Sequence, residues 1–152
     1  MNVVKTRIIA GFPGVGKSHL TTLDNLSVLD LDSSNFSHNE NGELNPDFPE
    51  NYIKEIKLNI GKVEYILIST HKEVRELLQV YNIPYTIVYP DMYLKEEYLD
   101  RYVKRNSKES LINHISENWE NYIMDIENET FPMLIKLHSG EYLTDVFKRR
   151  GL

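Results

Sequence analysis

Cysteine is absent from the 152-residue chain, which excludes a disulfide framework, a thiolate metal site and a cysteine nucleophile, and suits a reducing compartment. A membrane-spanning helix needs about 20 apolar residues in succession, and no stretch of the sequence approaches that length. Residues 1–10 are typical of a strand and not of a signal peptide. We therefore expect a cytoplasmic protein with no membrane partner.

Positive charge is also scarce. The chain carries 17 Lys and Arg residues against 23 Asp and Glu residues, a formal net charge of -6 at pH 7. Broad, non-specific binding of nucleic acid depends on counterion release by clustered Lys and Arg, so this balance argues against it but leaves room for a local basic patch. Hydrophobic residues make up 41% of the chain, enough for one domain over residues 1–152 to bury its own core.

Apolar runs typical of strands alternate with segments of helical periodicity, which predicts an α/β fold with a parallel sheet covered by helices on both faces. The predicted strands cover residues 3–10, 28–32, 63–69, 85–89 and 131–137. The predicted helices cover residues 18–24, 49–60, 70–81, 94–105, 108–127 and 141–149. Residues 33–49 are polar and rich in Asn, and we predict a long loop there.

Helical spacing also predicts which side chains are buried. Thr70 and Glu73 have the spacing of a capping box, which would begin the helix at residues 70–81. The apolar side chains expected to face the core from the helices are Ile53, Ile56, Ile60, Val74, Leu77, Leu78, Tyr81, Leu111, Ile115, Trp119, Tyr122, Ile126, Tyr142, Leu143, Val146 and Phe147.

The motif with the clearest chemistry is GFPGVGKS at residues 11–18, which matches the P-loop pattern G-x-x-x-x-G-K-[ST] between a predicted strand and a predicted helix. Its glycines let the backbone curl so that amide N–H groups point at phosphate oxygens, and the N-terminus of the next helix adds a favourable field. The alternative is a glycine-rich turn without a ligand.

We predict that this loop binds the triphosphate of a nucleotide, ATP with Mg²⁺. The residues expected to contact the nucleotide are Gly11, Pro13, Gly14, Val15, Gly16, Lys17, Ser18 and His19. In this pattern Lys17 reaches the β- and γ-phosphates, and the Ser18 hydroxyl ligates Mg²⁺.

Two carboxylates, Asp30 and Asp32, stand at the end of the second predicted strand. Alternation along a strand puts both side chains on the same face, and the carboxyl ends of parallel strands open into the ligand crevice. Asp30 can hold Mg²⁺ through water, while Asp32 can orient and deprotonate an attacking hydroxyl. The alternative is that both are turn or cap residues, a reading that suits Asp30 less because it interrupts an apolar run.

From residue 8 to about residue 36 the chain resembles the shikimate and gluconate kinases, in which an Asp-x-Asp strand end follows the P-loop. It is also similar to the kinase domain of phage polynucleotide kinases, where an Asp at this place is the general base. More broadly it resembles nucleoside and nucleotide kinases and small kinase-like proteins of bacteriophages. A phage origin would place it in the host cytoplasm.

This resemblance implies a three-layer P-loop NTPase fold with a five-stranded parallel sheet in the order 2-3-1-4-5. It also implies an acceptor-binding region at residues 33–52 and a mobile lid at about residues 92–110. The third predicted strand ends in Ser69, Thr70 and His71 without the carboxylate that hydrolytic P-loop enzymes usually carry there. An Asn-Lys-x-Asp motif for guanine recognition is absent too, so the sequence favours transfer over hydrolysis.

Between Lys17 and Lys54 there is no Lys or Arg, although nucleoside monophosphate kinases usually hold the acceptor phosphate with arginine from this region. Either the acceptor is a hydroxyl compound that needs a base, which suits Asp32, or its phosphate is held elsewhere. His71, Lys72 and Arg75 are the substitutes that we predict. The alternatives are a cap-region role for His71 and a solvated ion pair for Arg75.

The predicted helix at residues 94–105 carries Arg101 and Arg105 one turn apart, in the region where the resemblance places the lid. We predict that Arg105 neutralises charge on the transferring phosphoryl group and that Arg101 contacts the acceptor. The alternative is that surface pairs such as Glu97 with Arg101 occupy these side chains.

Together the residues favour an ATP-dependent phosphotransferase that moves the γ-phosphoryl group of Mg-ATP to a nucleoside, nucleotide or similar polyol acceptor. The predicted catalytic residues are Lys17, Asp32 and Arg105, and the predicted metal ligands are Ser18 and Asp30. Two alternatives stay open: a kinase for the 5′-hydroxyl end of a nucleic acid, and a nucleotide-binding regulatory module without catalysis. The acidic balance disfavours the first, and the paired aspartates disfavour the second.

Overall fold

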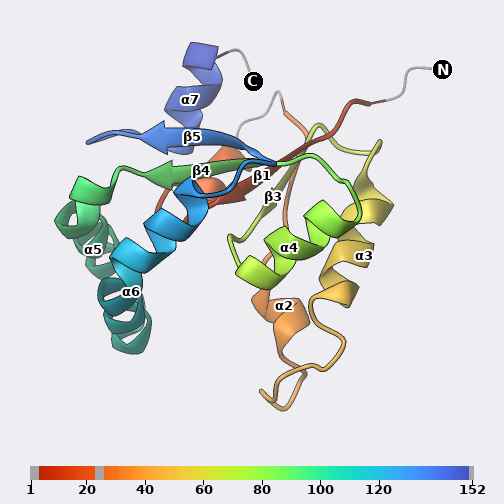
Figure 1. Cartoon of the computed structure of the whole chain (residues 1–152), viewed down its shortest axis with the longest axis horizontal. Coiled ribbons are helices and arrows are strands. Elements are labelled where there is room, and N and C mark those ends of the chain that lie inside the picture. Colours follow the sequence, from red (N-terminus) through yellow and green to blue (C-terminus); the bar gives the residue numbers. More distant parts are fainter. Residues whose placement is uncertain (1–3, 23–25, 151–152) are drawn as a thin grey trace.

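The computed structural model describes residues 4–22 and 26–150, so the predicted strand start at residue 3 and the predicted helix end at residues 23–24 lie outside the described residues. Parallel strands form a 5-stranded sheet in the order β2-β3-β1-β4-β5 (Figure 1). The strands are β1 (Arg7–Gly11), β2 (Val28–Asp30), β3 (Tyr65–Ile68), β4 (Thr86–Pro90) and β5 (Met133–Leu137). The predicted α/β class, the parallel sheet and its strand order are confirmed.

Helices cover the sheet on both faces, which makes three layers (Figure 1). The helices are α1 (Lys17–Leu20), α2 (Ser34–Ser37), α3 (Glu50–Asn59), α4 (Lys72–Val80), the 3-10 helix η1 (Met92–Leu94), α5 (Lys95–Lys104), α6 (Glu109–Glu127) and α7 (Leu143–Arg150). Figure 1 shows α7 on one side of the sheet and α3, α4 and α6 on the other. Within the described part of the chain, no helix is both long enough and apolar enough to cross a membrane.

The centre of the sheet is apolar on both faces, as expected of parallel strands that helices cover. All of β3 is buried, and so are Ile8, Ile9 and Ala10 of β1. Each fully buried Ile or Leu contributes about 1.5–3 kcal/mol relative to leaving it exposed. The register pairs Ala10 with Ile68, so that the chain leaves β1 and β3 at the same edge of the sheet.

Residues 33–49, predicted as a loop, contain more local structure than their composition indicates. Asp32 Oδ1 accepts hydrogen bonds from the backbone amide of Ser34 at 3.0 Å and from its hydroxyl at 2.9 Å, and α2 follows directly. Farther on, an isolated antiparallel bridge joins His38 to Leu44. Side chains that bond to nearby backbone organise such turns, and polarity alone does not reveal them.

Several expected details of the helices are wrong. The capping box is not formed, because α4 begins at Lys72 after His71, and His71 makes no side-chain cap hydrogen bond. Five apolar side chains that we predicted to be buried are exposed: Ile60, Tyr81, Leu111, Tyr122 and Tyr142. Periodicity cannot tell a core contact from the wall of a cavity, and the last three of these line cavities described below.

Candidate active site

The P-loop (residues 11–18) begins with a tight turn that its sequence explains. The amide of Val15 donates to the carbonyl of Phe12 at 3.2 Å, with Pro13 and Gly14 between them. Proline suits the first central position of a type II turn and glycine the second, where φ must be positive. Gly14 has φ 94° and Gly16 has φ 92°, values at which any side chain would be strained.

Scaffold donors bind the carbonyl groups of this loop. Tyr102 Oη donates to Pro13 O at 2.6 Å, and Arg101 Nη1 donates to Gly14 O at 2.8 Å. The amide of Leu143, at the start of α7, donates to Val15 O at 2.8 Å. The loop acceptors are therefore turned toward the protein.

The amides of Gly14 and Gly16 have no hydrogen-bond partner within residues 4–22 and 26–150. Backbone donors without a partner are costly unless water or a ligand satisfies them. Successive amides around glycines with positive φ are typical of anion-binding concavities. The loop thus leaves donors available for a ligand and no comparable set of acceptors.

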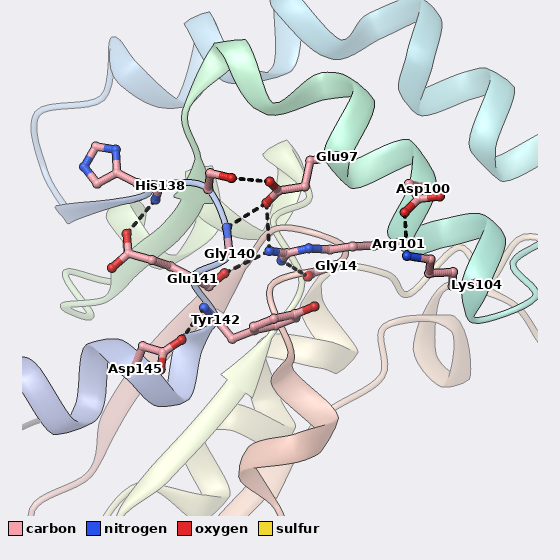
Figure 2. Close-up of polar contacts among 11 residues, drawn as sticks. Gly14, Glu97, Asp100, Arg101, Lys104, His138, Gly140, Glu141, Tyr142 and Asp145 are labelled. Carbon is pink, nitrogen blue, oxygen red and sulfur yellow. Dashed lines mark hydrogen bonds and ion pairs between the residues drawn. The ribbon is translucent and has the colours of Figure 1, made fainter.

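Arg101 links the P-loop to neighbouring elements (Figure 2). Its guanidinium lies 4.3 Å from the ring centroid of Tyr98 and 4.0 Å from that of Tyr142. Besides Gly14, it donates to the backbone carbonyl of Glu141 at 3.1 Å. Only 11% of its side chain is exposed. Arg101 therefore holds the P-loop, α5 and the turn after β5 together, and it is committed to these contacts.

Glu97, in the first turn of α5, contacts both Arg101 and the turn after β5 (Figure 2). One carboxylate oxygen accepts from Ser139 Oγ at 2.5 Å, and the other accepts from the amide of Gly140 at 3.0 Å. The second oxygen also pairs with Arg101 at 3.1 Å. The Ser139 and Gly140 hydrogen bonds, followed by the Arg101 charge, hold the pKa of Glu97 below its usual range.

The Lys17 side chain packs against Gly11, the first residue of the loop. A Cβ at Gly11 would come within 2.7 Å of the Lys17 side-chain carbons, so glycine there leaves room for the lysine stem. Burial lowers the pKa of Lys17, and the carboxylates of Asp30 and Asp32 act in the opposite direction, while the Arg105 charge lowers it further. Asp30, Asp32 and Arg105 are therefore within electrostatic reach of Lys17.

The paired aspartates have different surroundings. Partial desolvation is the main cause that raises the pKa of Asp30. The Lys17 charge lowers this pKa, and the Asp32 charge raises it further. Asp32 is held through Oδ1 by the amide and hydroxyl of Ser34. Asp32 therefore makes a turn contact, as the alternative reading predicted. It is also within electrostatic reach of Lys17. Neither carboxylate is buried in the protein interior.

Two of the other predicted acceptor residues, His71 and Arg75, line one cavity with Lys17. His71 Nε2 lies 3.1 Å from Ser33 Oγ, and burial lowers the pKa of His71. Arg75 is 4% exposed and donates from Nε to Thr70 O at 2.9 Å. Two carboxylates occupy the ends of its guanidinium: Asp125 Oδ2 of α6 at 3.1 Å, and Oε2 of Glu129, two residues after the end of α6, at 3.0 Å.

Two cavities adjoin the P-loop and share no lining residue. The first, about 450 Å³, is lined by Gly14, Gly16 and Ser18 together with α5 and Tyr142. The second, about 390 Å³, is lined by residues 11–13 and Lys17 together with the end of β3, α4 and α6.

Sequence reasoning missed the aromatic and acidic side chains that hold the P-loop and Arg101 beside the first cavity, which we call the outer cavity. Tyr98, Tyr102 and Glu97 carry no motif, and Tyr142 was assigned to the core. The only local signal was the i,i+4 spacing of Glu97 and Arg101, because the other contacts join residues that are far apart in the chain.

Asp30, Asp32 and Arg105 are therefore within electrostatic reach of Lys17, in a loop that offers hydrogen-bond donors. Such a set can bind an anion, hold a cation beside it and accept a proton from a third group. Their roles stay predictions, because placement alone does not test them. No protein-family model matches the chain, and no curated protein matches it either.

Proposed function

We propose that the chain is an ATP-dependent phosphotransferase, which moves the γ-phosphoryl group of Mg-ATP to a nucleoside, nucleotide or similar polyol acceptor. The observation that carries this proposal is the P-loop with its partly buried Lys17, together with a group of charges, Asp30, Asp32 and Arg105, within electrostatic reach of that lysine. Phosphoryl transfer depends mainly on positioning and on stabilising charge, and this group combines cations for the phosphates with carboxylates for the metal and the acceptor.

The loop amides and Lys17 would bind the phosphate oxygens and stabilise the charge that develops on the phosphoryl group. Arg105 would approach the same charge from the end of α5. The loop is held in place before the substrate binds by Tyr102, Arg101 and the Leu143 amide, so that its amides need little reorganisation during the reaction.

The residues present also fit Mg²⁺. The described residues include no group of three or more His, Asp or Glu side chains that could hold a metal by themselves. A nucleotide-bound Mg²⁺ needs only one or two protein oxygens, because phosphates and waters fill the other positions. Ser18 and Asp30 supply such oxygens beside the loop. Held by Ser18 and Asp30, the ion would neutralise part of the charge of the phosphates.

Asp32 would act as general base. The two contacts with Ser34 go to Oδ1, which orients the carboxylate and leaves Oδ2 to accept a proton. The acceptor hydroxyl would give its proton to Asp32 while its oxygen bonds to the γ-phosphorus. The bond from that phosphorus to the bridging oxygen of ADP would break, and ADP would leave with the electron pair.

We expect purified protein to transfer labelled γ-phosphate from ATP to at least one member of a panel of nucleosides, nucleotides, polyols and oligonucleotides. Asp32→Asn should lower the rate of transfer by about 10²–10⁴-fold and leave ATP binding intact, because the amide cannot accept the proton. Lys17→Ala should weaken both binding and transfer. Ser34→Ala is the matched control, since it removes a contact to Asp32 without removing the carboxylate.

Two results would replace the proposal with an alternative. If ATP binds but no acceptor is labelled and no ATP is consumed, the chain is a nucleotide-binding module. If only oligonucleotide 5′ ends are labelled, the chain is a polynucleotide kinase.

A further inference from the structure

We propose that the cavity of about 390 Å³ beside Lys17 receives the acceptor, and that it selects an uncharged alcohol that carries an aromatic ring, such as a nucleoside, over a phosphorylated one. This inference rests on the proposed function and names the substrate class of that site.

The position of the cavity points to the acceptor. In phosphoryl transfer the attacking oxygen and the leaving oxygen lie roughly in line on opposite sides of the phosphorus. The outer cavity meets the loop at Gly14, Gly16 and Ser18, where the rest of the donor nucleotide would lie. The second cavity meets it at residues 11–13 and Lys17. A molecule in this second cavity therefore has one end beside the lysine that would hold the γ-phosphate.

Lys17 would be engaged by the γ-phosphate, and the other charged side chains of the cavity argue against a phosphorylated acceptor, because Lys72 and Arg75 are balanced by Glu73 and Asp125. Recognition of a phosphate uses a free arginine fork or an unpaired ammonium. Arg75 is paired with both Asp125 and Glu129, and the Lys72 ammonium lies 3.9 Å from Asp125. Burial holds the pKa of His71 below its usual value, which favours the neutral ring. An entering phosphate would instead face the Asp125 carboxylate, whose side chain is 41% exposed.

Much of the remaining lining of the cavity is apolar. Leu111, Ile115, Tyr122 and Ile126 contribute to it from α6, and Phe12 contributes from the P-loop. Two of them, Leu111 and Tyr122, are exposed although they are large, which is a typical feature of a binding cavity. The volume lies near the small end of the range for pockets that bury one ligand, about 300–1,000 Å³.

Two polar features of the cavity lining suit the base and the hydroxyl groups of a nucleoside. Tyr122 Oη and His114 Nε2 lie 2.6 Å apart. At the end of β3, the buried Ser69 hydroxyl has no hydrogen-bond partner among the described residues. Burying a hydroxyl without a partner is costly, and a polar group of a bound molecule would satisfy it.

The test compares matched pairs: adenosine, cytidine and thymidine against their 5′-monophosphates, with γ-labelled ATP as donor. We expect the wild-type protein to label a nucleoside at least about tenfold faster than its monophosphate, because like charges brought together cost several kcal/mol. Asp125→Asn frees Lys72 and half of the Arg75 fork, so it should shift that ratio toward the monophosphate by about tenfold. Glu127→Gln is the control, since it removes the same charge from α6 outside the cavity lining.

Equal or faster labelling of monophosphates would overturn the inference and leave the proposed phosphotransferase intact. If no acceptor is labelled, methyl NMR spectra of Leu111 and Ile115 still decide the matter. Nucleosides should shift these signals more than monophosphates do at equal concentration, and an absence of such shifts would refute the assignment of the cavity.

Discussion

At the scale of single residues, Arg101 and Arg105 stand one turn apart on α5 but have different surroundings. Arg101 is stacked between two tyrosines and bonded to the P-loop and to the turn after β5. Arg105 is exposed, donates to Ser107 Oγ at 3.0 Å, and contributes to the field at Lys17. The first side chain thus has a structural position and the second is free to turn toward a phosphate.

This difference predicts separate effects for two alanine variants. Arg105→Ala should lower phosphoryl transfer by about 10²-fold and change the free energy of unfolding by no more than about 0.5 kcal/mol. Arg101→Ala should lower the free energy of unfolding by about 2 kcal/mol or more, because it leaves carbonyls and a carboxylate without their charged donor. Urea unfolding and the transfer assay measure the two effects. A stable Arg101→Ala variant with full activity would contradict this division.

Sequence reasoning found the residues whose chemistry is written locally. The P-loop motif lies within residues 11–18, and the aspartates belong to one strand end. It could not decide between the two arginines, because the choice depends on Tyr142, which is brought to Arg101 by the fold. The i,i+4 spacing correctly indicated the pair of Glu97 and Arg101, but it did not indicate that the pair is part of the loop scaffold.

At the scale of elements, Glu97 joins the first turn of α5 to the turn between β5 and α7 (Figure 2). Its pKa is depressed in the folded protein, so its contribution to stability is present above the pKa of the unfolded chain. That contribution is lost as the pH falls through the pKa of the folded state. This link should therefore weaken on acidification below about pH 4.

We accordingly predict that Glu97→Gln lowers the urea midpoint at pH 7, and that its difference from the wild type shrinks as the pH falls below about 4. Asp100→Asn removes a neighbouring carboxylate that forms an exposed pair with Lys104, and it should change the midpoint little. A difference between Glu97→Gln and wild type that stays constant down to about pH 3 would show that the carboxylate does not provide this link.

Arg75 connects α4 to α6 through Asp125, and to the segment that follows α6 through Glu129. The residue was predicted as an acceptor contact, and the structure gives it a buried structural position as well. Arg75→Met should lower the free energy of unfolding by about 3–5 kcal/mol, because it leaves Glu129 buried without its partner.

Adding Glu129→Gln to Arg75→Met should restore part of that loss, since the double variant removes the uncompensated charge. Urea unfolding of the single and double variants forms a thermodynamic cycle. An Arg75→Met protein as stable as the wild type would show that the ion pairs contribute nothing to the packing of α4 on α6.

At the scale of the whole molecule, the alternation of apolar runs and helical periodicity predicted the parallel sheet, and the family resemblance implied the strand order that the structure has. Both depend on features that recur along the chain. The two cavities could not be predicted, because they arise where distant elements meet. Leu111 and Tyr122 show why: their helical spacing matches that of the buried Ile115 and Trp119, yet they face a cavity.

The most direct test of the central claim is the binding of ATP, ADP and AMP with Mg²⁺, measured by titration calorimetry on the wild type and on Lys17→Ala. If the loop amides and Lys17 hold the β- and γ-phosphates, affinity should fall from ATP through ADP to AMP. The Lys17→Ala change should then weaken ATP binding far more than AMP binding. Equal affinity for the three nucleotides, or no binding of ATP to the wild type, would contradict the account.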